Sequence, residues 1–267
     1  MTLNFPGSNF SKVVDLSLPI SEDFPSNWPA HMPFQHKTFN WFVHRQDETT
    51  SLTDKNGPYT TKWMVLDEHT GTHMDAPSHF IPPQGSGLPY ASAWGSVSSE
   101  RVPLTQLMGP AAVIEVALPD ATPGHSPIIS RASIESWEEV HGELQPGDVV
   151  LLASGWDRNY LPGNAGNAYA YDAFVLKQSA GWPAPDEEAI DFLLGRGILC
   201  IGTDGPTMGP AHGGQGVHVH ALGSGAVLIE CLANLNALPP RGSMFMFLPI
   251  ALINGTGAPG RAIGLLP

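Results

Sequence analysis

The chain has 267 residues, a formal net charge of −13, and only 14% charged residues against 42% hydrophobic ones. This acidity argues against nucleic acid as a partner, because the phosphates of a nucleic acid would repel the chain. The high apolar content excludes a disordered chain. No apolar run reaches the roughly 18 residues of a membrane span, so we expect no membrane segment.

The first third of the chain predicts short strands separated by loops. Residues 13–20 alternate apolar and polar side chains and predict a strand, whereas the Pro-rich residues 24–34 predict a loop. Residues 60–66 predict a strand that leads into a histidine-rich motif. Residues 81–99 are rich in Gly, Pro and Ser, and we expect an excursion there that could cover a site.

The rest of the chain alternates helices with strands. Residues 130–140 begin with Ser and carry Ile134 and Trp137 at helical spacing, so they predict a helix. Residues 185–196 predict another, because acidic side chains crowd their first turn. With no linker or repeat, we expect residues 1–267 to form a single α/β domain with a mixed sheet or barrel. Apolar runs predict strands at residues 111–116, 149–153, 198–202, 227–232 and 244–250.

Residues 69–79, with the sequence His-Thr-Gly-Thr-His-Met-Asp-Ala-Pro-Ser-His, are the most informative stretch. His69, His73, Asp75 and His79 all stand at odd-numbered positions, and on an extended strand these share one face. Imidazole nitrogen and carboxylate oxygen are the usual ligands of zinc, manganese and iron. The pattern therefore predicts a metal site with His69, His73 and Asp75 as its first-choice ligands.

A second group of polar residues lies between residue 204 and residue 230. Glu230 stands inside Val-Leu-Ile-Glu-Cys-Leu, and a carboxylate buried there needs a cation or a donor, which predicts a role at or beside the metal. His218 and His220 share parity, so both would face the site if their segment is extended. Asp204 follows a predicted strand, where it either joins the site or forms a turn.

The motif of residues 69–79 resembles the signature of the metal-dependent cyclase family, which includes isatin hydrolases and bacterial kynurenine formamidases. The resemblance covers nearly the whole chain and implies the family's swivelling β/β/α fold. Weaker matches occur in the family's order at Asp-Leu-Ser-Leu-Pro-Ile (residues 15–20), Gly-Asp-Val-Val-Leu-Leu (147–152), Gly-Thr-Asp-Gly-Pro (202–206), and His218 followed by Glu230.

The resemblance also implies roles for single residues of the motif. It makes His69, His73 and Asp75 metal ligands, and it makes His79 the residue that transfers protons. A neutral imidazole titrates near working pH and can pass a proton to a leaving nitrogen, so this role is chemically sound. A role for His79 as a fourth ligand remains open.

The number of metal ions is left open by the same resemblance. His218 and Glu230 have the spacing of the family's second-metal pair, and two ions would make Asp75 the bridge between them. Isatin-hydrolase-like members use one manganese ion with an amide or another side chain from this segment. Gln215 is the candidate here, and its alternative role is a loop amide bonded to backbone. We favour one ion, with Mn²⁺ as the first choice and Zn²⁺ as the second. His218 and Glu230 would then contact the other ligands, and His218 could also contact the substrate.

Trp28 stands in the loop where the family carries an aromatic residue that contacts substrate, and its ring could stack on a planar one. Trp41, Phe42, Trp63 and Trp156 are further candidates, although such residues are more often core. The resemblance favours metal-dependent hydrolysis of an aryl cyclic amide, isatin to isatinate. The formamide of N-formylkynurenine is the alternative substrate, and a non-catalytic metal-dependent binding protein is the alternative from another class.

Cys200 and Cys231 both lie in apolar runs, so we expect buried free thiols. Residues 1–7 carry neither a basic region nor a long apolar core, which predicts no signal peptide and a cytoplasmic protein. The low charge and many apolar residues also fit a chain that buries surface in a homo-oligomer, with a dimer as the first expectation.

Overall fold

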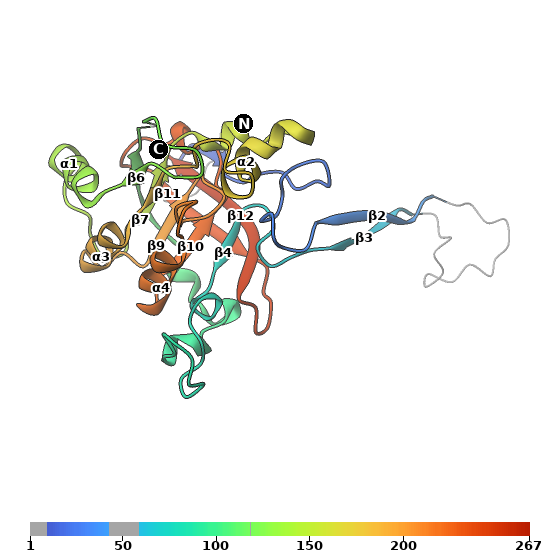
Figure 1. The fold of residues 1–267 in the computed structure, drawn as a ribbon, viewed down its shortest axis with the longest axis horizontal. Helices are drawn as coiled ribbons and strands as arrows, with labels where there is room; N and C mark the ends of the chain where they lie inside the picture. The colour runs from blue at the N-terminus through green and yellow to red at the C-terminus, as the bar shows by residue number, and fades with distance from the viewer. Residues whose placement is uncertain (1–9, 43–58, 118) are drawn as a thin grey trace.

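A computed structural model describes residues 10–42, 59–117 and 119–267, so residues 1–7, which led us to expect no signal peptide, lie outside it. The described residues form a mixed α/β fold around one large sheet (Figure 1). The strands of this sheet are β1 (Lys12–Asp15), β4 (His73–Asp75), β5 (Met108–Glu115), β7 (Val149–Ala153), β9 (Cys200–Thr203), β10 (Val227–Glu230), β11 (Met244–Pro249) and β12 (Gly257–Leu266).

The sheet closes into a barrel. Its strand order is β1-β12-β11-β5-β7-β9-β10-β4, and β12 pairs with β4 as well, so seven strands form a ring with β1 attached to β12. The neighbours β5, β7, β9 and β10 run parallel, whereas β4, β11 and β12 pair antiparallel with their neighbours. This arrangement confirms the expected α/β class with a mixed sheet or barrel.

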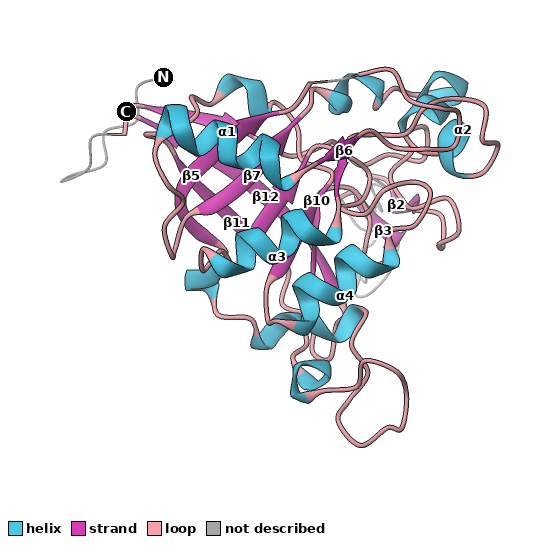
Figure 2. Cartoon of the chain, turned by 60° about the vertical axis from the view of Figure 1, so that its left-hand side comes forward, coloured by secondary structure: helices cyan, strands magenta, loops and turns pink. Residues whose placement is uncertain are grey.

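Three helices cover the outer face of the parallel strands (Figure 2). They are α1 (Arg131–His141), α3 (Glu187–Gly195) and α4 (Gln215–Gly223). The first two confirm the predicted helices, and each begins at a capping side chain: Ser130 accepts from the backbone of Ser133, and Asp186 accepts from that of Ala189. None of the helices in the described residues has the length and apolar character that crossing a bilayer requires.

Shorter elements connect these layers. The two-residue strands β6 (Ile128–Ile129) and β8 (Ala184–Pro185) pair with each other, and α2 (Tyr171–Phe174) is a single turn. The 3-10 helices are η1 (Pro77–His79), η2 (Ala93–Ser96), η3 (Ser99–Arg101), η4 (Leu104–Gln106), η5 (Trp156–Asn159), η6 (Gly163–Tyr169) and η7 (Leu235–Ala237).

Both faces of the parallel strands are buried, which explains their continuous apolar runs. On β7, Leu151 points into the barrel with Val113 and Phe245, while Val150 points outward. The outward side chains pack against the helices, in a cluster that includes Ile134, Ile190, Leu193, Val217, Ile201 and Leu228.

The strands β2 (Gln35–Asn40) and β3 (Thr61–Val65) form an antiparallel ribbon that projects away from the barrel (Figure 1). Strand β3 confirms the prediction for residues 60–66, whereas β2 was not predicted. The strand predicted at residues 13–20 was too long, because β1 ends at Asp15 and only an isolated bridge from Ser17 to Leu232 follows it. The ribbon exposes Phe39, Trp63 and Met64, and Trp41 and Phe42, which follow β2, are exposed as well.

Candidate metal centre and pocket

The histidine motif folds as a turn, a short strand and a 3-10 turn, so the expectation of one extended strand was wrong. Only His73 and Asp75 share a strand face, that of β4. His69 precedes this strand in a turn that uses the left-handed backbone of Gly71, with φ of 61°. His79 ends η1, which Pro77 begins. The turns nevertheless return His69 and His79 to the carboxylate of Asp75.

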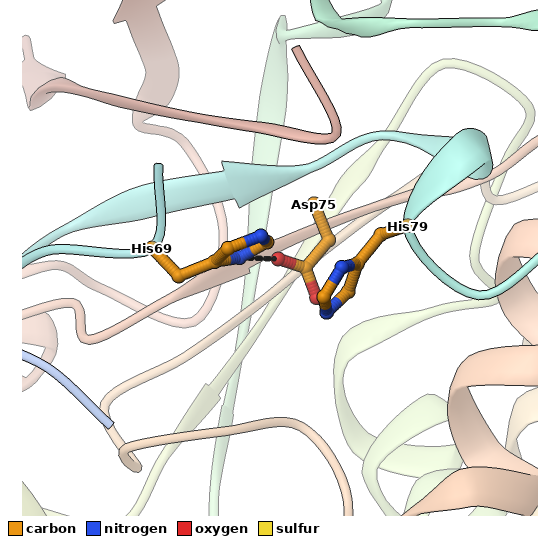
Figure 3. A group of neighbouring side chains, drawn as sticks. All are labelled: His69, Asp75 and His79. Carbon is orange, nitrogen blue, oxygen red and sulfur yellow. Dashed lines mark hydrogen bonds and ion pairs between the residues drawn. The ribbon is translucent and has the colours of Figure 1, made fainter. Parts of the chain in front are cut away.

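Asp75 lies between the imidazoles of His69 and His79 (Figure 3). Nδ1 of His69 is 2.8 Å from Oδ1 of Asp75, and the ring centroids of His69 and His79 are 4.1 Å apart. These three side chains offer ligand atoms that all lie within 4.8 Å of one another, so they could hold a metal ion. Burial lowers the pKa of His79 to about 4, below the range near working pH that the sequence led us to expect, so its imidazole is neutral at working pH.

Asp75 also belongs to a second group, with His73 and Glu230. Nδ1 of His73 donates to the carbonyl oxygen of Gly71 over 2.8 Å, which leaves Nε2 facing two carboxylates. That Nε2 is 3.4 Å from Asp75 and 3.5 Å from Glu230. Burial opposes a charged His73, but Asp75 and Glu230 raise its pKa well above the ordinary value.

Glu230 is anchored by backbone and side-chain donors at the end of β10. Its Oε1 accepts from the backbone N–H of Met208 over 2.6 Å and from the hydroxyl of Thr207 over 3.0 Å. Nε2 of His218, on α4, lies 3.2 Å from the same oxygen. Burial and Asp75 would raise the pKa of Glu230, yet His218 and His73 hold it at about 2.

The donor set fits a divalent cation. Asp75 is 1% exposed and Glu230 is 4% exposed. Among the described residues, every ion pair of these two carboxylates is with a histidine, and none is with Lys or Arg. Two carboxylates buried together repel each other, and burying a charge is costly unless it is paired or coordinates a metal.

A cavity of about 470 Å³ opens beside this cluster. All six ionisable candidates, from His69 to Glu230, line it, and Trp28 lies on its wall, with the ring of Phe174 4.5 Å from that of Trp28. None of residues 81–99 lines the cavity, so the expectation that this excursion covers the site was wrong.

The segment around His218 is helical, which overturns the expectation that His218 and His220 face the site together. On α4 two successive even positions point to different sides, and Nδ1 of His220 lies 2.9 Å from Asp191 on α3 instead. Gln215 is the first residue of α4 and lines the cavity as an exposed side chain.

Asp204 has a structural position behind the cavity. Its carboxylate accepts from the backbone N–H groups of Ser154 and Gly155, over 2.8 and 2.6 Å, and from the Ser154 hydroxyl. Burial raises the pKa of Asp204 to about 6. Cys200 and Cys231 are free and buried, as expected.

Sequence reasoning missed several contributors to the site. Thr207 and Met208 hold Glu230, and Phe80 and Phe174 line the cavity, yet they stand in loops or single turns without periodicity. The run Gly-Thr-Asp-Gly-Pro just before Thr207 was the one available signal.

Comparison with known proteins decides the family. The model of the Cyclase family, described as "Putative cyclase", matches residues 14–210. An isatin hydrolase of Roseibium aggregatum is 31% identical over 222 residues, which cover 80% of this chain and 78% of that protein. The chain belongs to the Cyclase family. The resemblance drawn from residues 69–79 is thereby confirmed.

Other relatives extend the comparison over nearly the whole chain. A kynurenine formamidase of Salinibacter ruber is 27% identical over 255 residues, covering 94% of this chain and 96% of its own. The crystal structure of an isatin hydrolase bound to the product analogue thioisatinate has the same fold, with a TM-score of 0.75 and 24% identity. That likeness covers 96% of this chain and 92% of the other.

Proposed function

We propose that this Cyclase family member hydrolyses the carbon–nitrogen bond of an aryl amide with the help of a divalent metal ion. Isatin, opened to isatinate, is our first substrate. The observation that carries the proposal is the meeting of two buried carboxylates with four imidazoles beside a cavity that has an aromatic wall. The relatedness to an isatin hydrolase supports the choice of substrate.

His69, His73 and Asp75 are the residues that we propose hold the metal, with the Gln215 amide as a further ligand. A bound divalent ion polarises a carbonyl and lowers the pKa of water to about 7. We keep Mn²⁺ as the first choice and Zn²⁺ as the second, because imidazole and carboxylate suit both. We favour one ion; the shared position of Asp75 in both ligand groups supports two as the alternative.

In a hydrolysis of this kind, water oxygen bonds to the carbonyl carbon, the carbon–nitrogen bond breaks, and a proton must reach the leaving nitrogen. We assign this proton transfer to His79, whose imidazole lines the cavity beside His69 and Asp75. The rings of Trp28 and Phe174 would stack on the aryl group and turn its carbonyl toward the cluster. His218 remains a candidate contact for the substrate's polar groups.

Arylformamidase activity is the second candidate, supported by the kynurenine formamidase relative that matches 94% of this chain. The test is to incubate Mn²⁺-loaded protein with isatin or with N-formylkynurenine and to follow each substrate's absorption. We expect turnover of both, with a higher kcat/KM for isatin. A reversed ratio would favour the formamidase. Metal-loaded protein that turns over neither substrate would favour the non-catalytic binding protein.

We also propose that the chain forms a homodimer through the β2–β3 ribbon. Two-stranded ribbons are marginally stable alone, and a group of exposed apolar side chains on one marks an interaction site. The exposed apolar side chains Phe39, Trp63 and Met64 are the group that we place at this interface. The molar mass of the wild type and of Trp63→Ser in solution, measured by light scattering, tests the proposed dimer. A monomeric wild type would refute the proposal.

A cytoplasmic location remains our proposal. It is supported by the two free, buried cysteines, because proteins of reducing compartments rarely form disulfides. Fractionation of the native host's cells would test it.

A further inference from the structure

His69 is held differently from the other two histidines of the buried cluster. His73 and His218 each direct Nδ1 at a backbone carbonyl oxygen, over 2.8 and 2.7 Å, and turn Nε2 toward carboxylates. His69 does the reverse. Its Nδ1 lies 2.8 Å from Oδ1 of Asp75, while its Nε2 lies 3.5 Å from the hydroxyl oxygen of Thr256.

The hydroxyl of Thr256 is itself committed to Glu68. Oε2 of Glu68 accepts from this hydroxyl over 2.8 Å, and from the backbone N–H groups of Thr256 and Gly257 over 2.6 and 3.2 Å. Because the hydroxyl proton is donated to Glu68, only lone pairs of the Thr256 oxygen are left to face His69. That oxygen therefore accepts a hydrogen bond from His69, and the donor is the Nε2–H group of the imidazole.

In a neutral imidazole, the form in which histidine binds a metal, this direction of hydrogen bonding leaves the other ring nitrogen of His69 without a proton. Its Nδ1 lone pair then faces a carboxylate oxygen 2.8 Å away, and two acceptors at that distance repel each other unless a cation lies between them. The loop that carries Thr256 is fixed on its far side as well, because its carbonyl oxygen accepts from the N–H of Ala76 over 2.9 Å. The contacts that run from Glu68 through Thr256 to His69 are therefore held by hydrogen-bonded backbone.

We propose that Glu68 and Thr256 are positioning residues, which hold His69 as the Nε2–H tautomer so that Nδ1 is its metal ligand. The inference rests on the metal site proposed above. Neither residue lines the cavity, so each acts through His69 and not on substrate. Partners of this kind orient a metal-bound imidazole and raise its basicity, and their loss typically costs about 10–100-fold in metal affinity.

The test compares Thr256→Val, which keeps the side-chain shape but removes the hydroxyl, with Thr256→Ser, which keeps the hydroxyl. Free Mn²⁺ is measured by electron paramagnetic resonance during titration of each protein. We expect a loss of about 10–100-fold in Mn²⁺ affinity for Thr256→Val and near wild-type affinity for Thr256→Ser. Equal affinity in all three proteins would overturn the proposal. Glu68→Gln, expected to lose affinity similarly, provides a second variant should Thr256→Val not fold.

A spectroscopic readout separates this proposal from a general loss of structure. Long-range ¹H–¹⁵N spectra of the Zn²⁺-loaded wild type report which nitrogen of His69 is bound to metal. We expect bound Nδ1 and protonated Nε2; bound Nε2 would refute the assignment. Neither readout needs turnover, so failure to hydrolyse isatin would count against the proposed function alone. Unchanged Mn²⁺ affinity in His69→Ala would overturn the inference itself.

Discussion

Gly257 offers the sharpest test of how the barrel shapes the group of histidines and carboxylates around Asp75. It begins β12, and a Cβ added there would lie 2.6 Å from Cε1 of His69 and 2.9 Å from each ring nitrogen. Ordinary contact begins at 3.4 Å, so the ring would have to retreat by 3.4 − 2.6 = 0.8 Å. The backbone cannot move aside instead, because Gly257 pairs with Asp75 and its N–H donates to Glu68.

Gly257→Ala should therefore displace His69 while leaving the fold in place. Overpacking costs about 1–3 kcal/mol of stability. Displacement of a group by about 1 Å costs on the order of 10²-fold in rate, and we expect a similar loss of Mn²⁺ affinity. The backbone of Gly257 has no positive φ, so the alanine introduces no backbone strain.

The assay is Mn²⁺ titration, with thermal unfolding measured on the same preparations. Gly213→Ala is the matched control, since Gly213 also lines the cavity but has no atom within 4 Å of the place where an added Cβ would lie. We expect the control to bind Mn²⁺ as the wild type does. Wild-type affinity in Gly257→Ala would refute the idea that this close approach fixes His69.

Four further predictions concern single side chains. His73→Ala should lose bound metal and activity together; full metal by elemental analysis would remove His73 from the ligand set. His79→Ala should keep its metal and lose roughly 10²–10⁴-fold in turnover, and a collapse of metal content instead would make His79 a ligand. Gln215→Ala should weaken Mn²⁺ binding, and unchanged affinity by titration would exclude the amide. Burial raises the pKa of Asp204 from 3.8 to about 6, so the folded state holds this proton more tightly than the unfolded chain, and stability should fall as pH rises between these values. The free energy of unfolding should fall by on the order of 3 kcal/mol over this pH range. Urea unfolding at several pH values should show that this fall is absent from the Asp204→Asn variant.

The buried parallel strands and the capped helices could be predicted because their signals are local. In β7 and β9 each side chain is buried on one face or the other, so the sequence is a continuous apolar run. In α3 the acidic first turn and the cap at Asp186 mark the beginning of the helix.

Elements that depend on distant contacts were missed. Strand β12 begins Gly-Ala-Pro-Gly, a composition that disfavours strands, and it forms because β4, β11 and β1 pair with it. Helix α4 follows two glycines and has few local signals. Tertiary pairing decides both.

The site shows the same division. The spacing of residues 69–79 predicted that these side chains lie close together, and they do even though the strand is three residues long, because Asp75 is a common partner of His69, His73 and His79. The contact between Glu68 and Thr256 joins residues 188 positions apart. No local pattern could have predicted it.

We propose that the cluster around Asp75 holds a metal ion on which hydrolysis of an aryl amide depends. The most direct measurement strips the protein of metal, returns Mn²⁺ in steps, and follows both bound metal and the loss of isatin's visible absorption. We predict no turnover in the stripped protein and turnover that rises with bound Mn²⁺ to a plateau at one ion per chain. Turnover without metal, or fully loaded protein that leaves both isatin and N-formylkynurenine intact, would contradict the account.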